Sequence, residues 1–274
     1  MNATRSRRAV ISGAAGIAAG SVAGQLLSIA RAEEAAPARA SQTGGVCLSM
    51  IFEDGPKSKF DTDKYLKNHL PLLRDVYGDS VERIELRVID GTDASIRMIP
   101  VFGGISSPLA TTTFWIKDIA AFGQKLAANA ARINKELDGL AKTNRLVQTD
   151  RVIQEYGEPR SAVATDTSVF SLYFRQPKAA TNAPVFDQKY FQESYLPALY
   201  SGLGPNAVRR LEASMGMVQG GQSPAVIAAY HVFIRDRDAY DLASGALAEV
   251  NKGLPTLTQN TTVMFSDMRV RGVV

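Results

Sequence analysis

The stretches FDTDKYLKNHLPLL (residues 60–73) and FDQKYFQESYLPAL (residues 186–199) decide the fold of this chain. Both begin with Phe-Asp and end with Leu-Pro-x-Leu, and their equivalent positions lie 126 residues apart. In each stretch a phenylalanine precedes an aspartate that is suited to cap a helix. Where the first stretch has His69, the second has Tyr195. The repeat predicts that one structural unit occurs twice in the chain.

The sequence around each stretch predicts the same order of strands and helices. In the first copy, VERIELRVI (81–89) alternates like a strand with one wet face, and residues 118–137 have helical periodicity. Strands are expected over 46–53, 81–89, 110–116, 150–156, 168–175, 207–217, 225–234 and 260–270. Helices are expected over 62–77, 118–137, 187–204 and 236–250. Each copy therefore reads β-α-β-β-α-β, which predicts a four-stranded antiparallel sheet with two helices on one face.

One such unit leaves the other face of its sheet bare, and a large bare apolar face needs a cover. Two units can pack sheet on sheet and hide both faces. We therefore expect an α+β fold of two tandem ferredoxin-like units that form a pseudo-dimeric sandwich or barrel. The expected domains are unit 1 (46–156), a linker (157–165) and unit 2 (166–274).

Residues 1–32 are typical of a signal peptide of the twin-arginine type. Arg7-Arg8 precedes a small, apolar, uncharged run, and Ala30-Arg31-Ala32 forms an A-x-A cleavage site. We expect the twin-arginine machinery to export the protein to the periplasm or medium, with 33–45 as a flexible lead-in. A weaker cleavage site at 38–40 and a retained membrane anchor are the alternatives.

Removal of the signal changes the charge argument. The full chain has a formal net charge of +4, but residues 1–32 contain four arginines and no acid. The remaining chain has 27 basic and 27 acidic residues. A neutral protein gives no electrostatic reason to expect a nucleic acid or an anionic membrane as partner. Homodimer formation stays open.

The first copy resembles the EthD family, named for ethyl tert-butyl ether degradation. The resemblance lies in Phe60-Asp61, Tyr65-Leu66, His69-x-Pro71-Leu72 and the later Gly78, and it extends over nearly all of 46–274. The second copy departs from it at Tyr195 and Ala198.

The resemblance implies a dimeric ferredoxin-like α+β barrel with a ligand cleft between sheet and helices. Family members accompany ether breakdown or resemble small decarboxylases, dehydratases and cofactor-free oxygenases. The wider superfamily also includes haem-dependent enzymes.

His69 is the candidate general acid/base, because a histidine pKa suits proton transfer at neutral pH. Tyr65, on the same predicted helix, is a candidate hydrogen-bond donor at the mouth of an apolar pocket. The alternative for His69 is a packing histidine that satisfies backbone groups freed by Pro71. A haem ligand is a further alternative. The expected function is binding or conversion of a small hydrophobic organic molecule in unit 1, or else a non-catalytic binding or structural module.

Three further residues are candidate substrate contacts: Tyr195, His231 and Trp115. The alternative interpretation of Tyr195 is amphipathic packing, that of His231 is a polar sheet edge, and that of Trp115 is core packing. The chain has two histidines and one cysteine, Cys47, so no histidine-rich metal site and no intrachain disulfide is expected. The sequence also lacks the phosphate-loop, nucleophile-elbow and zinc-protease motifs. No cofactor is expected.

Overall fold

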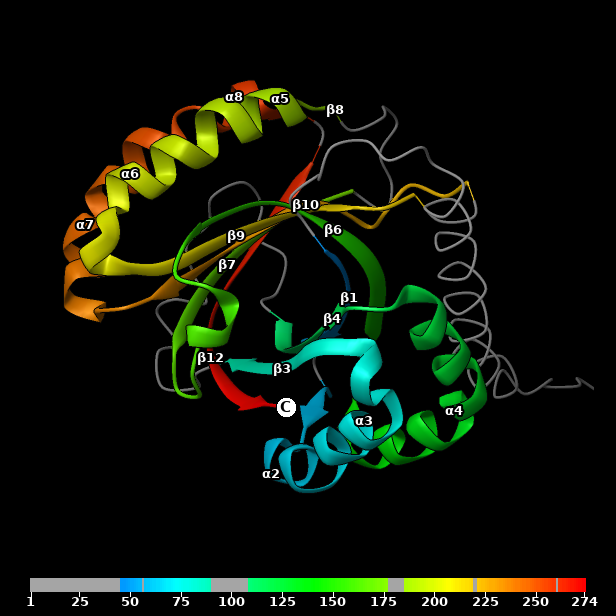
Figure 1. Ribbon diagram of the computed structural model, residues 1–274. Helices are drawn as coiled ribbons and strands as arrows, with labels where there is room; N and C mark the ends of the chain where they lie inside the picture. Colours follow the sequence, from blue (N-terminus) through cyan, green and yellow to red (C-terminus); the bar gives the residue numbers. More distant parts are fainter. Residues whose placement is uncertain (1–44, 56, 90–107, 177–184, 219–220, 260) are drawn as a thin grey trace, which may run out of the picture.

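The computed structural model describes residues 45–274 except 56, 90–107, 177–184, 219–220 and 260 (Figure 1). Of residues 244–249, 262 and 265 it describes the backbone alone. The predicted signal peptide lies outside the described residues. Among the described residues, no helix combines the length and the apolar character needed to cross a membrane.

Eight long strands form a closed barrel at the centre of the molecule (Figure 1). The strands are β1 (Val46–Glu53), β3 (Val81–Ile89), β4 (Pro108–Ile116), β6 (Arg145–Gly157), β7 (Ser168–Arg175), β9 (Val208–Gly216), β10 (Val226–Ile234) and β12 (Thr262–Val273). Their order around the barrel is β1-β4-β3-β12-β7-β10-β9-β6, and each pair of neighbouring strands is antiparallel. The two predicted units join at β3–β12 and at β6–β9. The α+β fold is confirmed, and of the two expected forms it is the barrel.

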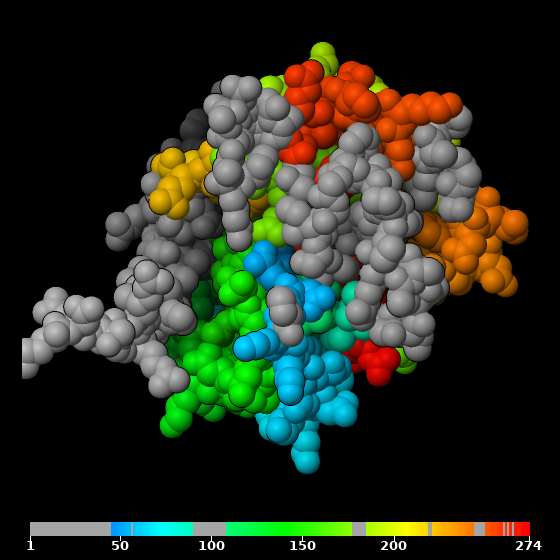
Figure 2. Space-filling view, turned by 180° about the vertical axis from the view of Figure 1, so that it is seen from behind, coloured from blue at the N-terminus to red at the C-terminus, as the bar shows by residue number. Residues whose placement is uncertain are grey.

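The helices cover the outside of the barrel, those of unit 1 and unit 2 on different sides (Figure 1). Unit 1 has α2 (Thr62–Lys64), a π-helical turn (Tyr65–His69), α3 (Leu70–Tyr77) and α4 (Ile119–Leu140). Unit 2 has α5 (Gln188–Tyr190), a π-helical turn (Phe191–Tyr195), α6 (Leu196–Ala207), α7 (Arg237–Asn251) and α8 (Leu254–Leu257). Seen from behind, the blue and green surface of unit 1 lies below the orange and red surface of unit 2 (Figure 2).

The first helix of each unit forms for the reason that the sequence predicts. Asp61 and Asp187 cap it by accepting hydrogen bonds from the backbone N–H groups of Lys64 and Tyr190. Both helices then widen into the π-helical turn, in which the N–H of Leu70 reaches the carbonyl of Tyr65, five residues back. A proline follows each turn by two residues, and since proline lacks an N–H it cannot continue the α-helical ladder.

Two short strand pairs fix where these helices begin. Strand β2 (Lys59–Phe60) pairs with β5 (Ala141–Lys142) in unit 1, and β8 (Val185–Phe186) pairs with β11 (Thr258–Gln259) in unit 2. In each unit one strand of the pair comes just before the first helix, and the other comes just after the last helix. The sequence patterns did not predict these pairs, because two-residue strands are too short to show an alternation.

Each barrel strand has one face toward the helices and one toward the barrel lumen. Ile84 and Leu86 of β3 pack in the helix-facing core of unit 1. The alternate residues Arg83, Glu85 and Arg87 point into the lumen, and Glu85 and Arg87 are 0% exposed. The prediction of a wet face for this strand is therefore wrong. Closure of the barrel buries the polar face as well, which alternation along one strand cannot reveal.

Candidate functional site

The structure divides the five predicted site residues among three places. Tyr65 and His69 lie together between the helices and sheet of unit 1, where they join its apolar core. Tyr195 lies in the corresponding layer of unit 2. Trp115 and His231 alternate with helix-facing residues of β4 and β10 and lie in the barrel lumen. The structure therefore brings Tyr65 and His69 together and places the three candidate substrate contacts elsewhere.

His69 is fully buried, and among the described residues neither of its ring nitrogens has a hydrogen-bond partner. Its ring centroid lies 4.7 Å from that of Tyr65. Burial lowers the pKa of His69 to about 4, and the positive charge of Arg145 adds to this effect. The imidazole is therefore neutral at pH 7. This pKa lies below the neutral range that general acid catalysis by His69 would need, and the neutral imidazole keeps one N–H donor and one acceptor nitrogen.

Tyr65 is buried beside His69, and its hydroxyl is hydrogen-bonded to the Thr112 hydroxyl at 2.7 Å between oxygens. Burial raises the pKa of Tyr65 well above its ordinary value, so the phenol stays protonated. Phe60 packs on the other side of Tyr65, with ring centroids 5.1 Å apart. Tyr65 is thus the middle ring of a row Phe60–Tyr65–His69, which holds the histidine in a fixed orientation.

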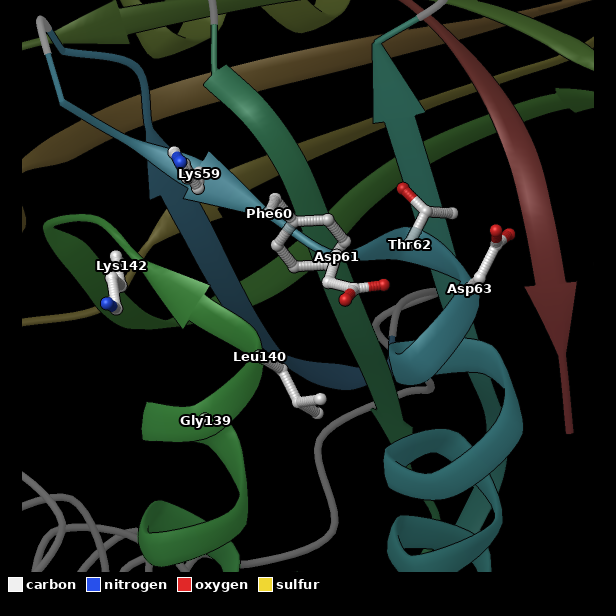
Figure 3. A pocket seen from close by; sticks show the side chains of 8 residues that line it. All are labelled: Lys59, Phe60, Asp61, Thr62, Asp63, Gly139, Leu140 and Lys142. Atoms are coloured by element: carbon white, nitrogen blue, oxygen red, sulfur yellow. The ribbon is translucent and has the colours of Figure 1, made fainter.

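A cleft of about 530 Å³ opens on the Phe60 end of this row (Figure 3). Its walls come from β2, the start of α2, the end of α4 and β5. The lining residues are Lys59, Phe60, Asp61, Thr62, Asp63, Gly139, Leu140 and Lys142. Figure 3 shows the Phe60 ring near the middle of the view, above Leu140 at the end of α4. The Phe60 ring therefore stands between solvent and the Tyr65–His69 pair.

At the corresponding position of unit 2, the polar group is the Tyr195 hydroxyl, and it has hydrogen-bond partners within the protein. The Tyr195 hydroxyl donates to the Asn251 side-chain oxygen at 3.1 Å and lies 3.5 Å from the Tyr230 hydroxyl. Burial raises the pKa of Tyr195 to about 12. Tyr195 is thus a packed, hydrogen-bonded core tyrosine, in contrast to the unpartnered His69.

Trp115 belongs to a charged network inside the barrel. Its indole N–H donates to Glu212 at 3.2 Å, and the Arg160 guanidinium lies over its ring at 4.8 Å from the centroid. Glu212 also accepts hydrogen bonds from Arg160 and Arg210, each at 2.9 Å. Burial opposes ionisation of Glu212, but the charges of Arg160 and Arg210 outweigh it and lower the pKa to about 2.

The same network continues on β3. Glu85 accepts from Arg83 at 2.7 Å and from Arg87 at 2.6 Å. The sequence analysis did not single out these groups. The available signal was the run of charges at every second position of residues 83–87, which was interpreted as solvent-facing. Arg160 was missed because it belongs to the predicted linker, which in the structure folds over one end of the barrel.

His231 faces the lumen from the middle of β10, so its predicted place at a sheet edge is wrong. Its Nδ1 lies 2.8 Å from the Ser171 hydroxyl, and its ring centroid lies 5.6 Å from that of Tyr173. Burial and the charge of Arg87 lower the pKa of His231 to about 3, although Glu212 acts in the opposite direction. His231 is therefore neutral at pH 7.

The described residues contain no group of three histidine, cysteine or acidic side chains placed to hold a metal ion. They also do not fit a haem at either histidine. His69 packs against Tyr65 with no exposed surface, and His231 is enclosed by lumen side chains. Cys47 is buried on β1, as expected for a small apolar residue, and burial raises the pKa of its thiol.

Comparison with solved structures shows what the fold resembles. An anthrone oxidase-like protein aligns at 12% identity and a TM-score of 0.50, covering 84% of this chain and 92% of its own. A candidate monooxygenase from Fusobacterium nucleatum aligns at 10% identity and a TM-score of 0.54, covering 85% of this chain and 95% of its own.

An EthD-like protein from Ralstonia eutropha aligns at 15% identity over 39% of this chain and 89% of its own. Its TM-score of 0.33 is too low to argue from. No family model and no curated protein matches the sequence. At these identities the likeness establishes architecture alone: the chain has the fold of the dimeric α+β barrel proteins.

Proposed function

We propose that the protein binds a small, largely apolar molecule in the helix–sheet layer of unit 1, with His69 as the polar contact. The observation that carries this proposal is the unpartnered imidazole of His69. A buried polar group without a partner costs about 1–3 kcal/mol, and native proteins retain few such groups. Unit 2 avoids this cost with Tyr195 and Asn251. A ligand that hydrogen-bonds to His69 would explain why unit 1 does not.

The protonation state of His69 narrows the ligand class. A neutral imidazole offers one N–H donor and one acceptor nitrogen, so it suits a hydroxyl group, which can both donate and accept. The surrounding rings of Tyr65, Phe60 and Phe52 offer an apolar surface to the rest of the molecule. We therefore propose a hydroxyl-bearing aromatic or similarly apolar compound. In a reaction, His69 would accept the hydroxyl proton as a weak base.

Access to this site requires movement of Phe60. The ring lies at the start of the helix, on a strand pair of two residues per strand, and borders the 530 Å³ cleft. A strand pair this short has few hydrogen bonds to break, so it can open without disturbing the barrel. We propose that the ligand enters through the cleft as the Phe60 ring turns aside.

Calorimetric titration with 1-naphthol and with naphthalene tests the proposal. We expect the wild-type protein to prefer 1-naphthol, and His69→Phe to reduce that preference about threefold to tenfold, the value of one net hydrogen bond. The matched control is Tyr195→Phe, which removes a buried hydroxyl from the equivalent position of unit 2 and should leave the preference unchanged. If His69→Phe binds the two compounds with equal affinity, His69 accounts for the whole preference. If the wild type binds both compounds with equal affinity, the proposal is refuted.

The competing haem hypothesis has its own readout. An absorption spectrum of the purified protein would show a Soret band if haem were bound, whatever the outcome with 1-naphthol. We also propose that the protein is exported and cleaved after Ala32, on the strength of Arg7-Arg8 and Ala30-Arg31-Ala32 in the sequence. N-terminal sequencing of the protein recovered from a periplasmic extract tests this.

A further inference from the structure

A buried arginine of the barrel lumen lacks the partners that its charge requires. Arg87 is 0% exposed, and its Nε donates to Glu85 at 2.6 Å. Its two terminal nitrogens, Nη1 and Nη2, have no hydrogen-bond partner in the part of the chain that the structure describes. We propose that they hold a small monovalent oxyanion of the formate or nitrate class inside the barrel, at a site separate from the His69 layer.

The distribution of charge in the lumen favours an anion at Arg87. Arg160 and Arg210 share Glu212 and Glu155, and Arg160 also pairs with Glu82. Arg83 and Arg87 share Glu85, and no second carboxylate pairs with them among the described residues. The excess carboxylate therefore lies at Arg160, and although the charge of Glu212 acts on Arg87, Glu212 forms no ion pair with it. The terminal nitrogens of Arg87 thus stay unpaired in a buried place, which is costly, and a bound monovalent anion would pair with them.

Comparison of the two units shows that the barrel does not need Arg87. Strand register places Glu85 opposite Thr113 and Glu212 opposite His231, so these two glutamates are equivalent. The residue two places later is Arg87 in β3 and Ser214 in β9, opposite Thr111 and Ala229. Unit 2 closes the same part of the lumen with a serine. A guanidinium is therefore retained in unit 1 for a reason other than closing the barrel.

The surroundings of Arg87 suit a small planar anion. Its guanidinium lies 5.0 Å from the Phe233 ring centroid and 5.8 Å from that of Trp115. The buried hydroxyl of Tyr173 also lacks a partner, and Tyr173 lies within electrostatic range of Arg87. Two parallel N–H donors match the two oxygens of a carboxylate or nitrate, and the Tyr173 hydroxyl can supply a third donor.

Solvent reaches the neighbourhood of this site from one end of the barrel. A cleft of about 350 Å³ at that end is lined in part by Trp115, Arg160 and Arg210. The ring of Trp115 thus separates the cleft from the Arg87 guanidinium. An anion can approach along the arginines of the cleft and pass the Trp115 indole. The fluorescence of Trp115 can therefore report anion binding.

The experiment uses the fluorescence of Trp115, the sole tryptophan of the chain. The full-length protein is titrated with formate at constant ionic strength, with sulfate as the balancing salt because a divalent anion does not match the site. We expect a saturable change in emission and a rise in the unfolding midpoint with formate concentration. If the unpartnered donors are hydrated by water alone, formate will have no saturable effect, and that result would overturn the proposal.

Three variants test whether formate binds at Arg87. Tyr173→Phe keeps every arginine–glutamate pair, so it should fold, and we expect it to weaken formate binding about threefold to tenfold. Arg87→Lys keeps a positive charge beside Glu85 but loses the paired donors, and it should abolish saturation in the accessible range. Tyr156→Phe is the matched control, because Tyr156 also has an unpartnered hydroxyl but stacks on Tyr200 outside the lumen. A formate affinity that is the same in Tyr173→Phe and Tyr156→Phe would contradict the proposed site.

Discussion

Two buried side chains distinguish unit 1 from unit 2 at the scale of single residues. His69 stands where unit 2 has Tyr195, and Arg87 stands where unit 2 has Ser214. In both cases the unit 1 residue has nitrogens without partners. Since unit 2 forms the same architecture without either group, neither is required by the fold. The equivalent strands and helices of unit 2 therefore serve as an internal control for both residues.

The titration of His69 makes stability depend on pH. Its pKa is about 4 in the folded protein against an ordinary value of 6.5, so the unfolded chain binds the proton more readily. The stability from keeping His69 neutral is full above pH 6.5 and is lost as the pH falls toward 4. We expect the wild type to lose about 2 kcal/mol relative to His69→Phe between pH 7.5 and pH 5.

Urea unfolding of both proteins at the two pH values measures this difference. His231, whose pKa burial also lowers, and Asp150, whose pKa burial raises to about 7, titrate in both proteins and cancel. A stability difference that stays constant across the pH range would show that His69 is already protonated or solvated in the folded state.

At the scale of elements, the first helix of each unit is the most fully determined feature. The N-caps Asp61 and Asp187, the π-helical turn and the following proline occur in both copies. Gly78 follows the end of α3, and Gly204 forms a kink within α6; both have positive φ, which favours glycine there. The π-helical turn is thus part of the architecture, and its presence around His69 is not by itself a sign of function.

Removal of either cap should destabilise the protein by a similar amount. The Lys64 and Tyr190 N–H groups donate to Asp61 and Asp187 at 3.1 Å and 2.8 Å. We expect Asp61→Ala and Asp187→Ala each to cost about 1 kcal/mol in chemical unfolding. Asp63→Ala, an exposed acid of the same first turn, should cost clearly less. Equal effects of Asp61→Ala and Asp63→Ala would mean that helix-dipole electrostatics, and not the cap hydrogen bond, stabilises this end.

At the scale of the whole molecule, the barrel depends on two seams between the units, β3–β12 and β6–β9. Arg160 strengthens the second seam by joining Glu155 of β6 to Glu212 of β9. Strand register also changes which residues of the two units are equivalent. The constant offset of 126 residues pairs Arg83 with Arg209, but strand register makes Arg210 the equivalent residue, because three residues separate Gly204 from Val208 and only two separate Gly78 from Val81.

Gly157 is a glycine of this seam that cannot readily be replaced. Its φ is +82°, and an added Cβ would collide with the carbonyl oxygen of Arg209. We expect Gly157→Ala to cost about 2–3 kcal/mol, because it combines an unfavourable φ with a backbone clash. Gly139→Ala, in open space near the end of α4, should be neutral or slightly stabilising. Thermal unfolding compares the two, and a tolerated Gly157→Ala would show that the seam can shift.

The sequence by itself determined the order of the elements, the caps, the ends of the first helices and the two-unit architecture. These features depend on local chemistry: a capping carboxylate, a proline without an N–H, a glycine with positive φ and the alternation of apolar residues. The tertiary structure decided which faces are buried. Alternation marks two faces of a strand but cannot say that barrel closure hides both. For this reason Arg87 and Glu85 are buried although the alternation of 81–89 predicts a wet face, and Trp115 and His231 lie in the lumen, apart from the helix–sheet layers that contain Tyr65, His69 and Tyr195.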